Sequence, residues 1–446
     1  MLRLALGALR ARPAAFAGLA TALLLAVAVI TLFGSLIATA IAGGGDSRLA
    51  MIGGAFGEIA MLMALFVVSN TLGFSVRQQA RDMALLRTSG ATPVQVKRLI
   101  RCQVLLVILL VSPPAWVLGS WGARVFLTEL VARGLAPAAA GVPWSPWPML
   151  ISTAATSLVG VGATKLAARR TVRGRPSAAM AETAAEHGRL GWVRGIAGVL
   201  VLAGAGFLCA FTARQPADKA AQAALLGSLL LVIVVGLLGP LLARLAMVLL
   251  GLPFRLAGSR HLGDAGGWLA ADNLRGHAHR LASAVVPIAL LVGLSTTFAA
   301  VTGTLQKVAP PGTYAESDVW LRGVELAMLA GFGAVATVNT LVSLTAARRR
   351  EYALLTLTGA TRRQMFRMLG AEAALTAMAG VLLGILVAAP VSVSFAVAAT
   401  DGLLPSLPLE TYGSLVLGVV VLTVTTILVT GVKATSEPAV SAAATA

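Results

Sequence analysis

Residues 81–95 read RDMALLRTSGATPVQ, and residues 350–364 repeat them as REYALLTLTGATRRQ. The two stretches start 269 residues apart, the difference between 350 and 81. At the same offset Asn70-Thr71-Leu72 returns as Asn339-Thr340-Leu341, inside the apolar runs just upstream. An internal repeat fixes the architecture, because each copy builds the same structural unit. The sequence therefore predicts two copies of a membrane module, each presenting a charged segment on the same side of a bilayer.

The composition is that of a membrane protein. Hydrophobic residues make up 58% of the chain and charged residues only 12%, whereas about 25% charged residues are usual in soluble domains. The net charge of +18 comes from basic residues that lie between apolar runs instead of clustering, so no nucleic-acid partner is predicted. The two cysteines, Cys102 and Cys209, exclude a disulfide framework and a cysteine-rich metal site.

Runs of about 20 apolar residues indicate membrane spans, and the chain contains about ten of them. We therefore predict an all-α polytopic membrane protein that is surrounded by the lipid bilayer. The predicted spans are 14–42, 52–76, 99–123, 147–166, 194–212, 221–250, 281–303, 323–346, 369–397 and 412–432.

The distribution of basic residues predicts the orientation of these spans. Cytoplasmic loops carry an excess of Lys and Arg, and a cytoplasmic N-terminus places most of the 35 basic residues inside. Both termini are then cytoplasmic. The basic residues predicted to lie outside are Arg48, Arg124, Arg133, Arg214, Lys219, Lys307 and Arg322.

The predicted spans group into two repeats of four, joined by two connector spans. Two intervening spans return the chain to the side it left, so the repeats have the same orientation and are parallel. The predicted domains are residues 1–180 for the first repeat, 181–255 for the connector and 256–446 for the second repeat.

The repeated segment between the second and third spans of each repeat has readable local structure. Gly90 suits the left-handed residue that ends a helix, and Thr92 with Gln95 forms a capping box for the next helix. Gly359 and Thr361 repeat this arrangement with Gln364. We predict a rigid helix–turn–helix in each copy. An ordinary tight cytoplasmic loop is the alternative, but it does not require Ala-Leu-Leu and Gly-Ala-Thr in both copies.

This pattern, Arg-Asp/Glu-x-Ala-Leu-Leu-x-x-x-Gly-Ala-Thr-x-x-Gln after a span with Asn-Thr-Leu, resembles the signature of FtsX-like permeases, which include the MacB-type ABC transporter permeases. The resemblance covers both four-span repeats. It implies that each repeated segment couples to a cytoplasmic ABC ATPase, with two ATPase copies per chain. The implied coupling residues are Arg81, Asp82, Ala84, Leu85, Leu86, Gly90, Ala91, Thr92 and Gln95, and Arg350, Glu351, Ala353, Leu354, Leu355, Gly359, Ala360, Thr361 and Gln364.

The sequence gives no indication of catalysis by this chain. None of the five lysines is followed by Ser or Thr, so a phosphate loop of the Walker A type is excluded. No catalytic constellation and no metal site is predicted, since the pair His277-x-His279 is more typical of a solvated loop. ATP, Mg and ATP hydrolysis are expected only in the partner subunit.

The chain departs from the resembled family in its outer loops. Such permeases usually carry a large extracytoplasmic domain, whereas the loops at about 43–51 and 304–322 are too short to bury a core. A substrate is then expected at the outer leaflet or between the repeats. Glu58 and Glu325 are candidates for a substrate cleft, because ionisable residues within spans are often functional. The alternative is that both reach water at the membrane interface.

The resemblance therefore leads us to predict the permease subunit of a bacterial ABC transporter, located in the cytoplasmic membrane. We expect it to export or extract an amphiphile such as an antibiotic, peptide or lipid. Two other readings remain. A signal transmitter that drives a cell-wall hydrolase or sensor kinase would use the same coupling segments with an outer docking domain. An ion-coupled secondary transporter would have acidic residues or broken helices at the midplane.

Overall fold

The computed structural model describes residues 2–11, 13–173, 192–257, 278–310, 315–400 and 402–435. Within these ranges every regular element is a helix, which confirms the predicted fold class. The chain divides into two compact units, one containing α1 to α6 and the other α8 to α15, with residues 316–321 of α12 grouped with the first. The predicted boundary between residues 180 and 181 lies outside the described ranges.

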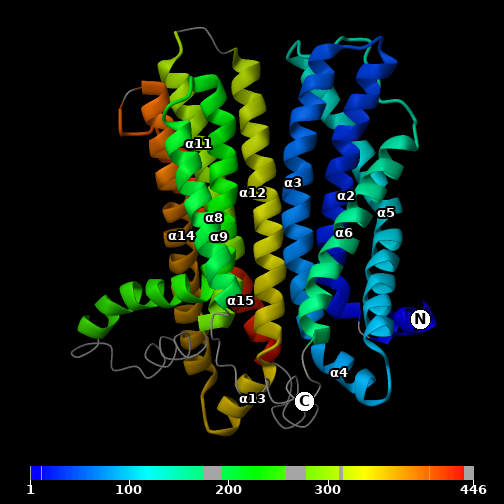
Figure 1. The fold of residues 1–446 in the computed structure, drawn as a ribbon, viewed down its shortest axis with the longest axis vertical. Coiled ribbons are helices and arrows are strands. Elements are labelled where there is room, and N and C mark those ends of the chain that lie inside the picture. Colours follow the sequence, from blue (N-terminus) through cyan, green and yellow to red (C-terminus); the bar gives the residue numbers. More distant parts are fainter. Residues whose placement is uncertain are drawn as a thin grey trace. The chain divides into compact units, whose positions relative to one another are not determined.

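The first unit is a helical bundle built around α2 (Figure 1). α2 packs against α3, α5 and α6, while the short α1 packs mainly on α5 and α4 lies at one end of the bundle. Their bounds are α1 Leu2–Ala11, α2 Pro13–Ala42, α3 Ser47–Gln78, α4 Ala80–Thr88, α5 Pro93–Ala132 and α6 Trp147–Arg173.

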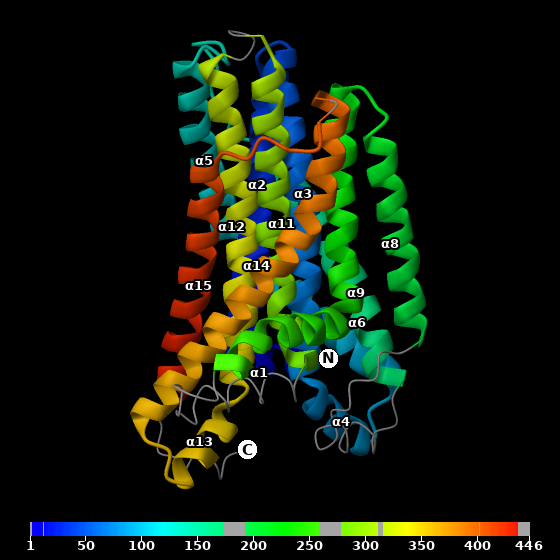
Figure 2. The ribbon, with the colours of Figure 1, turned by 90° about the vertical axis from the view of Figure 1, so that its left-hand side faces the viewer.

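The second unit is built around α11, which lies close to α14 and α9 (Figure 2). The span residues of α11 are almost all buried. α11 packs against α14, α9 and α15. The predicted connector helices α8 and α9 pack on each other and on α14, so they join the second repeat instead of forming a unit of their own. The bounds are α8 Trp192–Thr212, α9 Ala217–Ala257, α11 Ala278–Val308, α12 Glu316–Ala346, α13 Arg349–Leu357, α14 Arg362–Thr400 and α15 Leu409–Thr435.

The helices confirm the internal repeat. α3, α4 and α5 correspond to α12, α13 and α14, and each pair begins 269 residues apart, at residues 47 and 316, 80 and 349, and 93 and 362. Each repeat has the order long helix, long helix, short helix, long helix, long helix. The short helix in both copies is the segment between the second and third predicted spans.

Nine of the described helices are long and apolar enough to cross a membrane. They match nine of the predicted spans. The remaining prediction, residues 147–166, forms α6, whose serines and threonines make it less apolar. Two of these face neighbouring helices: the Ser152 hydroxyl lies 2.8 Å from that of Thr31 on α2, and the Thr153 hydroxyl donates to Ser112 on α5 at 3.2 Å. Some of the polar side chains of α6 thus form hydrogen bonds with other helices of the unit.

Glycines bring α11 and α14 into close contact. A Cβ atom at Gly380 would lie 2.3 Å from Ile288 Cγ2, and one at Gly384 would lie 2.5 Å from Val292 Cβ. Ile288 and Val292 are fully buried. Small residues at such crossings let helix backbones approach closely, which is a common means of helix association in membranes.

We expect Gly380→Val to destabilise the second unit, because its side chain would overlap that of Ile288. Overpacking of this kind typically costs about 1–3 kcal/mol. Thermal unfolding of the purified protein in detergent measures the effect. Gly370→Val on the same helix is the control, since nothing lies within 4 Å of a Cβ there. Equal losses of stability in the two variants would contradict the packing argument.

Candidate functional site

The first elbow, residues 80–95, joins α4 to α5 through a turn that satisfies the backbone groups at both helix ends. Gly90 has φ +97°, and the amides of Gly90 and Ala91 donate to the carbonyls of Arg87 (3.1 Å) and Leu86 (2.9 Å). This is the hydrogen-bond pattern of a Schellman helix end. The Thr92 amide then donates to Gln95 Oε1 at 2.9 Å, and the Gln95 amide donates to Thr92 Oγ1 at 3.3 Å. The predicted capping box is confirmed.

The second elbow, residues 349–364, has the same geometry. Gly359 also has φ +97°, and the Ala360 amide donates to the Leu355 carbonyl at 3.0 Å. The Thr361 amide donates to Gln364 Oε1 at 2.9 Å, and the Gln364 amide donates to Thr361 Oγ1 at 3.3 Å. The two copies therefore share one backbone structure in spite of their different side chains.

A buried side chain at the same position holds each elbow against its spans. In the first elbow this residue is Met83, which packs with Val76, Val96 and Ile100. In the second it is Tyr352, which is 1% exposed and belongs to a cluster with Leu341, Met365, Leu369 and Ile427. Each short helix is thus attached to the long helices on either side of it.

Each elbow also presents apolar side chains to its surroundings. Leu85 and its counterpart Leu354 are 51% and 50% exposed. Val94 adds a further exposed apolar side chain to the first elbow, and Leu357 and Phe366 do so at the second. Single exposed apolar side chains are common on protein surfaces, whereas several that gather in one patch can mark a site that binds another protein.

The predicted coupling residues differ in how far they are buried. Ala84 and Ala353 are buried and pack the short helices, whereas Leu86, Ala91, Glu351, Leu355 and Ala360 are partly buried. Arg81 and Asp82 lie in α4, but their side chains are outside the described part of the structure. The exposed predicted residues are Leu85, Gly90, Thr92, Gln95, Arg350, Leu354, Gly359, Thr361 and Gln364.

The second elbow carries an ion-pair cluster that the sequence reasoning missed. Arg348 Nε donates to Glu351 Oε2 at 2.8 Å, and Arg348 Nη1 is paired with Glu372 Oε1 of α14. The guanidinium carbon lies 5.1 Å from the centroid of the Tyr352 ring. At the repeat offset the positions of Arg348, Glu351, Tyr352 and Glu372 hold Gln79, Asp82, Met83 and Gln103 in the first repeat.

The surroundings keep the Arg348 guanidinium charged and the Tyr352 phenol neutral. Burial alone would lower the pKa of Arg348, but the carboxylates of Glu372 and Glu351, with Tyr352, raise it on balance. Burial raises the pKa of the Tyr352 phenol. One residue in the sequence could have indicated this cluster: Glu372 is a carboxylate within a predicted span.

The comparison with family models agrees with this geometry. The model of the FtsX-like permease C-terminal domain matches residues 54–176 and again residues 323–439, together more than half of the chain. The chain belongs to the FtsX-like permease family. No curated protein and no solved structure matches it. Both matched segments contain an elbow, so the resemblance seen in the sequence is confirmed for both repeats of this FtsX-like permease.

The two acidic residues predicted for a substrate cleft lie in different units of the permease. Glu58 is exposed and lines a cavity of the first unit, whereas Glu325 is partly buried in the second. The repeat offset pairs Glu58 with Ala327 and Glu325 with Phe56, so the acids do not occupy equivalent positions. A role for them in one shared cleft stays a prediction.

Removing one member of the buried ion pair should destabilise the second elbow. Arg348 and Glu372 each have side chains that are 12% exposed. Breaking a buried ion pair typically costs about 3–5 kcal/mol, and we expect the lower part of this range because Glu351 still pairs with Arg348. We expect Glu372→Ala to lower the thermal unfolding temperature in detergent. Gln103→Ala, at the corresponding position of the first repeat, removes no charge and should cost less.

The double variant Arg348→Met with Glu372→Leu should recover most of the loss, because replacing both charges by apolar groups is often nearly neutral. A double variant as unstable as Glu372→Ala would contradict this explanation, because the loss of stability would then not come from a buried charge that has lost its partner.

Proposed function

We propose that this chain is the permease subunit of a bacterial ABC transporter, and that both elbows dock a separate cytoplasmic ATPase. The family consists of permease subunits of ABC-type transporters or signalling systems, which normally work with such a partner. The observation that carries the proposal is the pair of elbows. Each has the same hydrogen-bonded turn and an exposed leucine at the same position, Leu85 or Leu354.

The long helices that follow the elbows suit the transmission of motion. α5 contains 40 residues and α14 contains 39, and each begins at the capping threonine of its elbow. At 1.5 Å per residue, such helices are roughly 60 Å long, enough to cross the bilayer. Because Met83 and Tyr352 fix the short helices to the spans, a displacement of an elbow moves the beginning of the long helix with it.

We propose that the transported substrate is an amphiphile that is exported or extracted from the membrane. Short outer connections support this proposal. Only residues 43–46 separate α2 from α3, and residues 309–315 separate α11 from α12. Such connections cannot form a folded substrate-binding domain, so the substrate is handled by the membrane helices. A signal transmitter that docks an outer partner through a domain in these loops is less well supported.

The docking proposal predicts that Leu85→Asp combined with Leu354→Asp abolishes co-purification with the ATPase. A carboxylate at an exposed apolar contact must be desolvated when the partner binds, which opposes binding. Co-expression and affinity capture of the ATPase measure this. Leu404→Asp is the control: Leu404 is 88% exposed in the connection between α14 and α15, away from the elbows. Undiminished ATPase capture by the double variant would refute docking at the elbows.

The presence of two elbows in one chain predicts a complex of one permease and two ATPase copies. Native mass spectrometry of the purified complex, trapped with a non-hydrolysable ATP analogue, gives the stoichiometry directly. Either single variant, Leu85→Asp or Leu354→Asp, should reduce the complex to one ATPase copy. Two permease chains for every two ATPases would contradict the proposed fusion of both halves in one polypeptide.

A further inference from the structure

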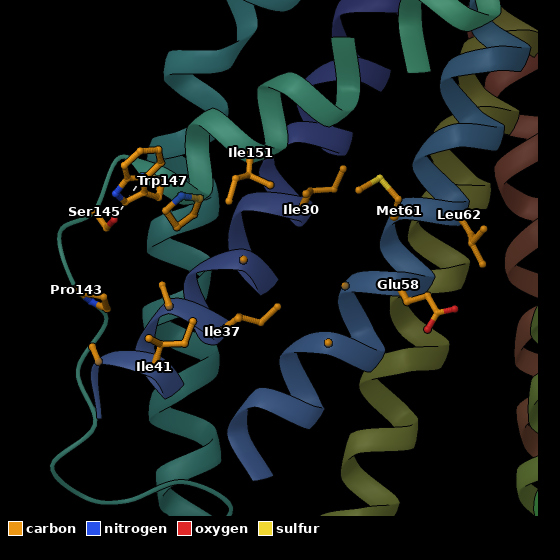
Figure 3. A pocket seen from close by; sticks show the side chains of 16 residues that line it. Ile30, Ile37, Ile41, Glu58, Met61, Leu62, Pro143, Ser145, Trp147 and Ile151 are labelled. Carbon is orange, nitrogen blue, oxygen red and sulfur yellow. Dashed lines mark hydrogen bonds between the residues drawn. The ribbon is translucent and has the colours of Figure 1, made fainter. Parts of the chain in front are cut away.

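The first unit contains a large apolar cavity between α2, α3 and α6. Its volume is about 820 Å³, within the usual range of ligand pockets, roughly 300–1,000 Å³. Figure 3 shows Ile37 and Met61 projecting into the space between α2 and α3. Ile30, Ile41 and Ile151 line it as well. A space of this size with an apolar lining suits a hydrocarbon chain.

The cavity lies within the membrane-spanning parts of its helices. The candidate spans are Phe16–Ala42 on α2 and Ser47–Gly73 on α3, and the lining residues of both helices fall inside them. Trp147, the first residue of α6, lines the cavity and is 67% exposed, as is typical of tryptophan at the membrane–water boundary. The cavity therefore lies at the depth of the apolar membrane spans, with a polar boundary close by.

Among the described residues that line this cavity, Glu58 is the only charged one. In Figure 3 the Glu58 carboxylate projects away from the isoleucines, at the edge of the α3 surface that lines the cavity. A carboxylate in a membrane span is costly unless water or a cation reaches it. The position therefore favours a ligand whose chain enters the apolar space and whose cationic head stays at the rim. An anionic head would be repelled.

The second unit has a cavity in the equivalent place with different chemistry. Gly54, Gly57, Glu58 and Met61 of the first cavity correspond, at the repeat offset, to Gly323, Leu326, Ala327 and Ala330, which line the second. The second cavity, between α11, α12 and α15, has a volume of only about 250 Å³.

Hydroxyl groups take a large part in lining this smaller space. Ser295 and Thr296 are buried there, and their hydroxyls have no hydrogen-bond partner among the described residues. Thr411, Tyr412 and Ser414 add further hydroxyls. The second cavity thus suits neither a long hydrocarbon chain nor a cation, and the two repeats differ at the same site.

We propose that the cavity of the first unit binds a long-chain amphiphile with an amine head group, its chain between α2, α3 and α6 and its ammonium at Glu58. This inference rests on the proposed function, because it names the class of substrate and the repeat that receives it.

Photolabelling tests the proposal on the full-length chain in lipid nanodiscs without an ATPase. The probes are a long-chain alkylamine and the fatty acid of equal length, each with a diazirine near the end of the chain. Peptide mapping should place the label on α2, α3 and α6, with severalfold more labelling by the amine. Label spread evenly over all lipid-facing helices, or equal labelling by the two probes, would overturn the proposal.

Gly54→Phe should block the site, because a Cβ at Gly54 meets nothing within 4 Å and the ring would enter the cavity. Labelling of the cavity residues should fall severalfold. Gly323→Phe, at the equivalent position, also has nothing within 4 Å of its Cβ and is the matched control. Should Gly54→Phe fail to fold, Met61→Trp fills the same space from about two helical turns further along α3. Unchanged labelling in the folded blocking variant would refute the site.

The variant Glu58→Gln tests the contribution of the head group separately from that of the hydrocarbon chain. It should abolish the preference for the amine over the fatty acid while the cavity residues remain labelled. A retained preference would show that Glu58 does not hold the head group. These outcomes are independent of the ATPase: a failure of the cavity proposal leaves capture of the ATPase through Leu85 and Leu354 intact, whereas a failure of the docking proposal leaves the labelling pattern intact.

Discussion

The turn at Gly90 and Gly359 is the constraint on which both repeats depend. A helix that ends outside the membrane leaves carbonyl groups without partners, and the next helix begins with free amides. With φ +97°, each glycine folds the chain so that the amides after it close the short helix, and a threonine and a glutamine cap the long one. A residue with a Cβ is strained in this conformation, and a longer loop would not hold the short helix against its spans. The stiffness of the elbow follows from this turn.

Backbone symmetry between the repeats is accompanied by chemical divergence. Met83 and Tyr352 occupy the same buried position, but one is an apolar side chain and the other is a phenol beside a buried ion pair. The site that holds Glu58 and a wide apolar space in one unit holds Ala327 and hydroxyls in the other. A homodimer must carry every substitution in both halves. A chain that contains both repeats is free of this restriction, so one half can specialise in binding while the other is stiffened at its elbow.

Local patterns sufficed to predict the helices and the elbows, because caps, glycine turns and apolar runs are properties of neighbouring residues. Features that join distant residues could not be predicted in this way. Arg348 lies in the turn before α13 and Glu372 lies in α14, and neither is part of a repeated motif, since the first repeat has glutamine at both positions. The cavity requires three helices and a loop, and its size depends on side chains such as Ile37 and Ile151 that look like ordinary span residues. Glu58 was recognisable as an unusual residue, but the sequence alone did not indicate which apolar surface surrounds it.

The long helix of the first repeat links the elbow to the neighbourhood of the cavity. α5 starts at the capping box and contains Pro113 and Pro114, which cannot donate backbone hydrogen bonds, so the helix is least stiff at this level. Just before them, Ser112 donates to the Ile108 carbonyl and accepts a hydrogen bond from Thr153 of α6. Thr153 is two residues from Ile151, which lines the cavity. In α14 the internal proline is Pro390, closer to the far end of the helix. The long helix after the first elbow is therefore interrupted by prolines beside α6, whereas the helix after the second elbow continues further before its proline. The two halves of one chain can thus respond differently to the same displacement.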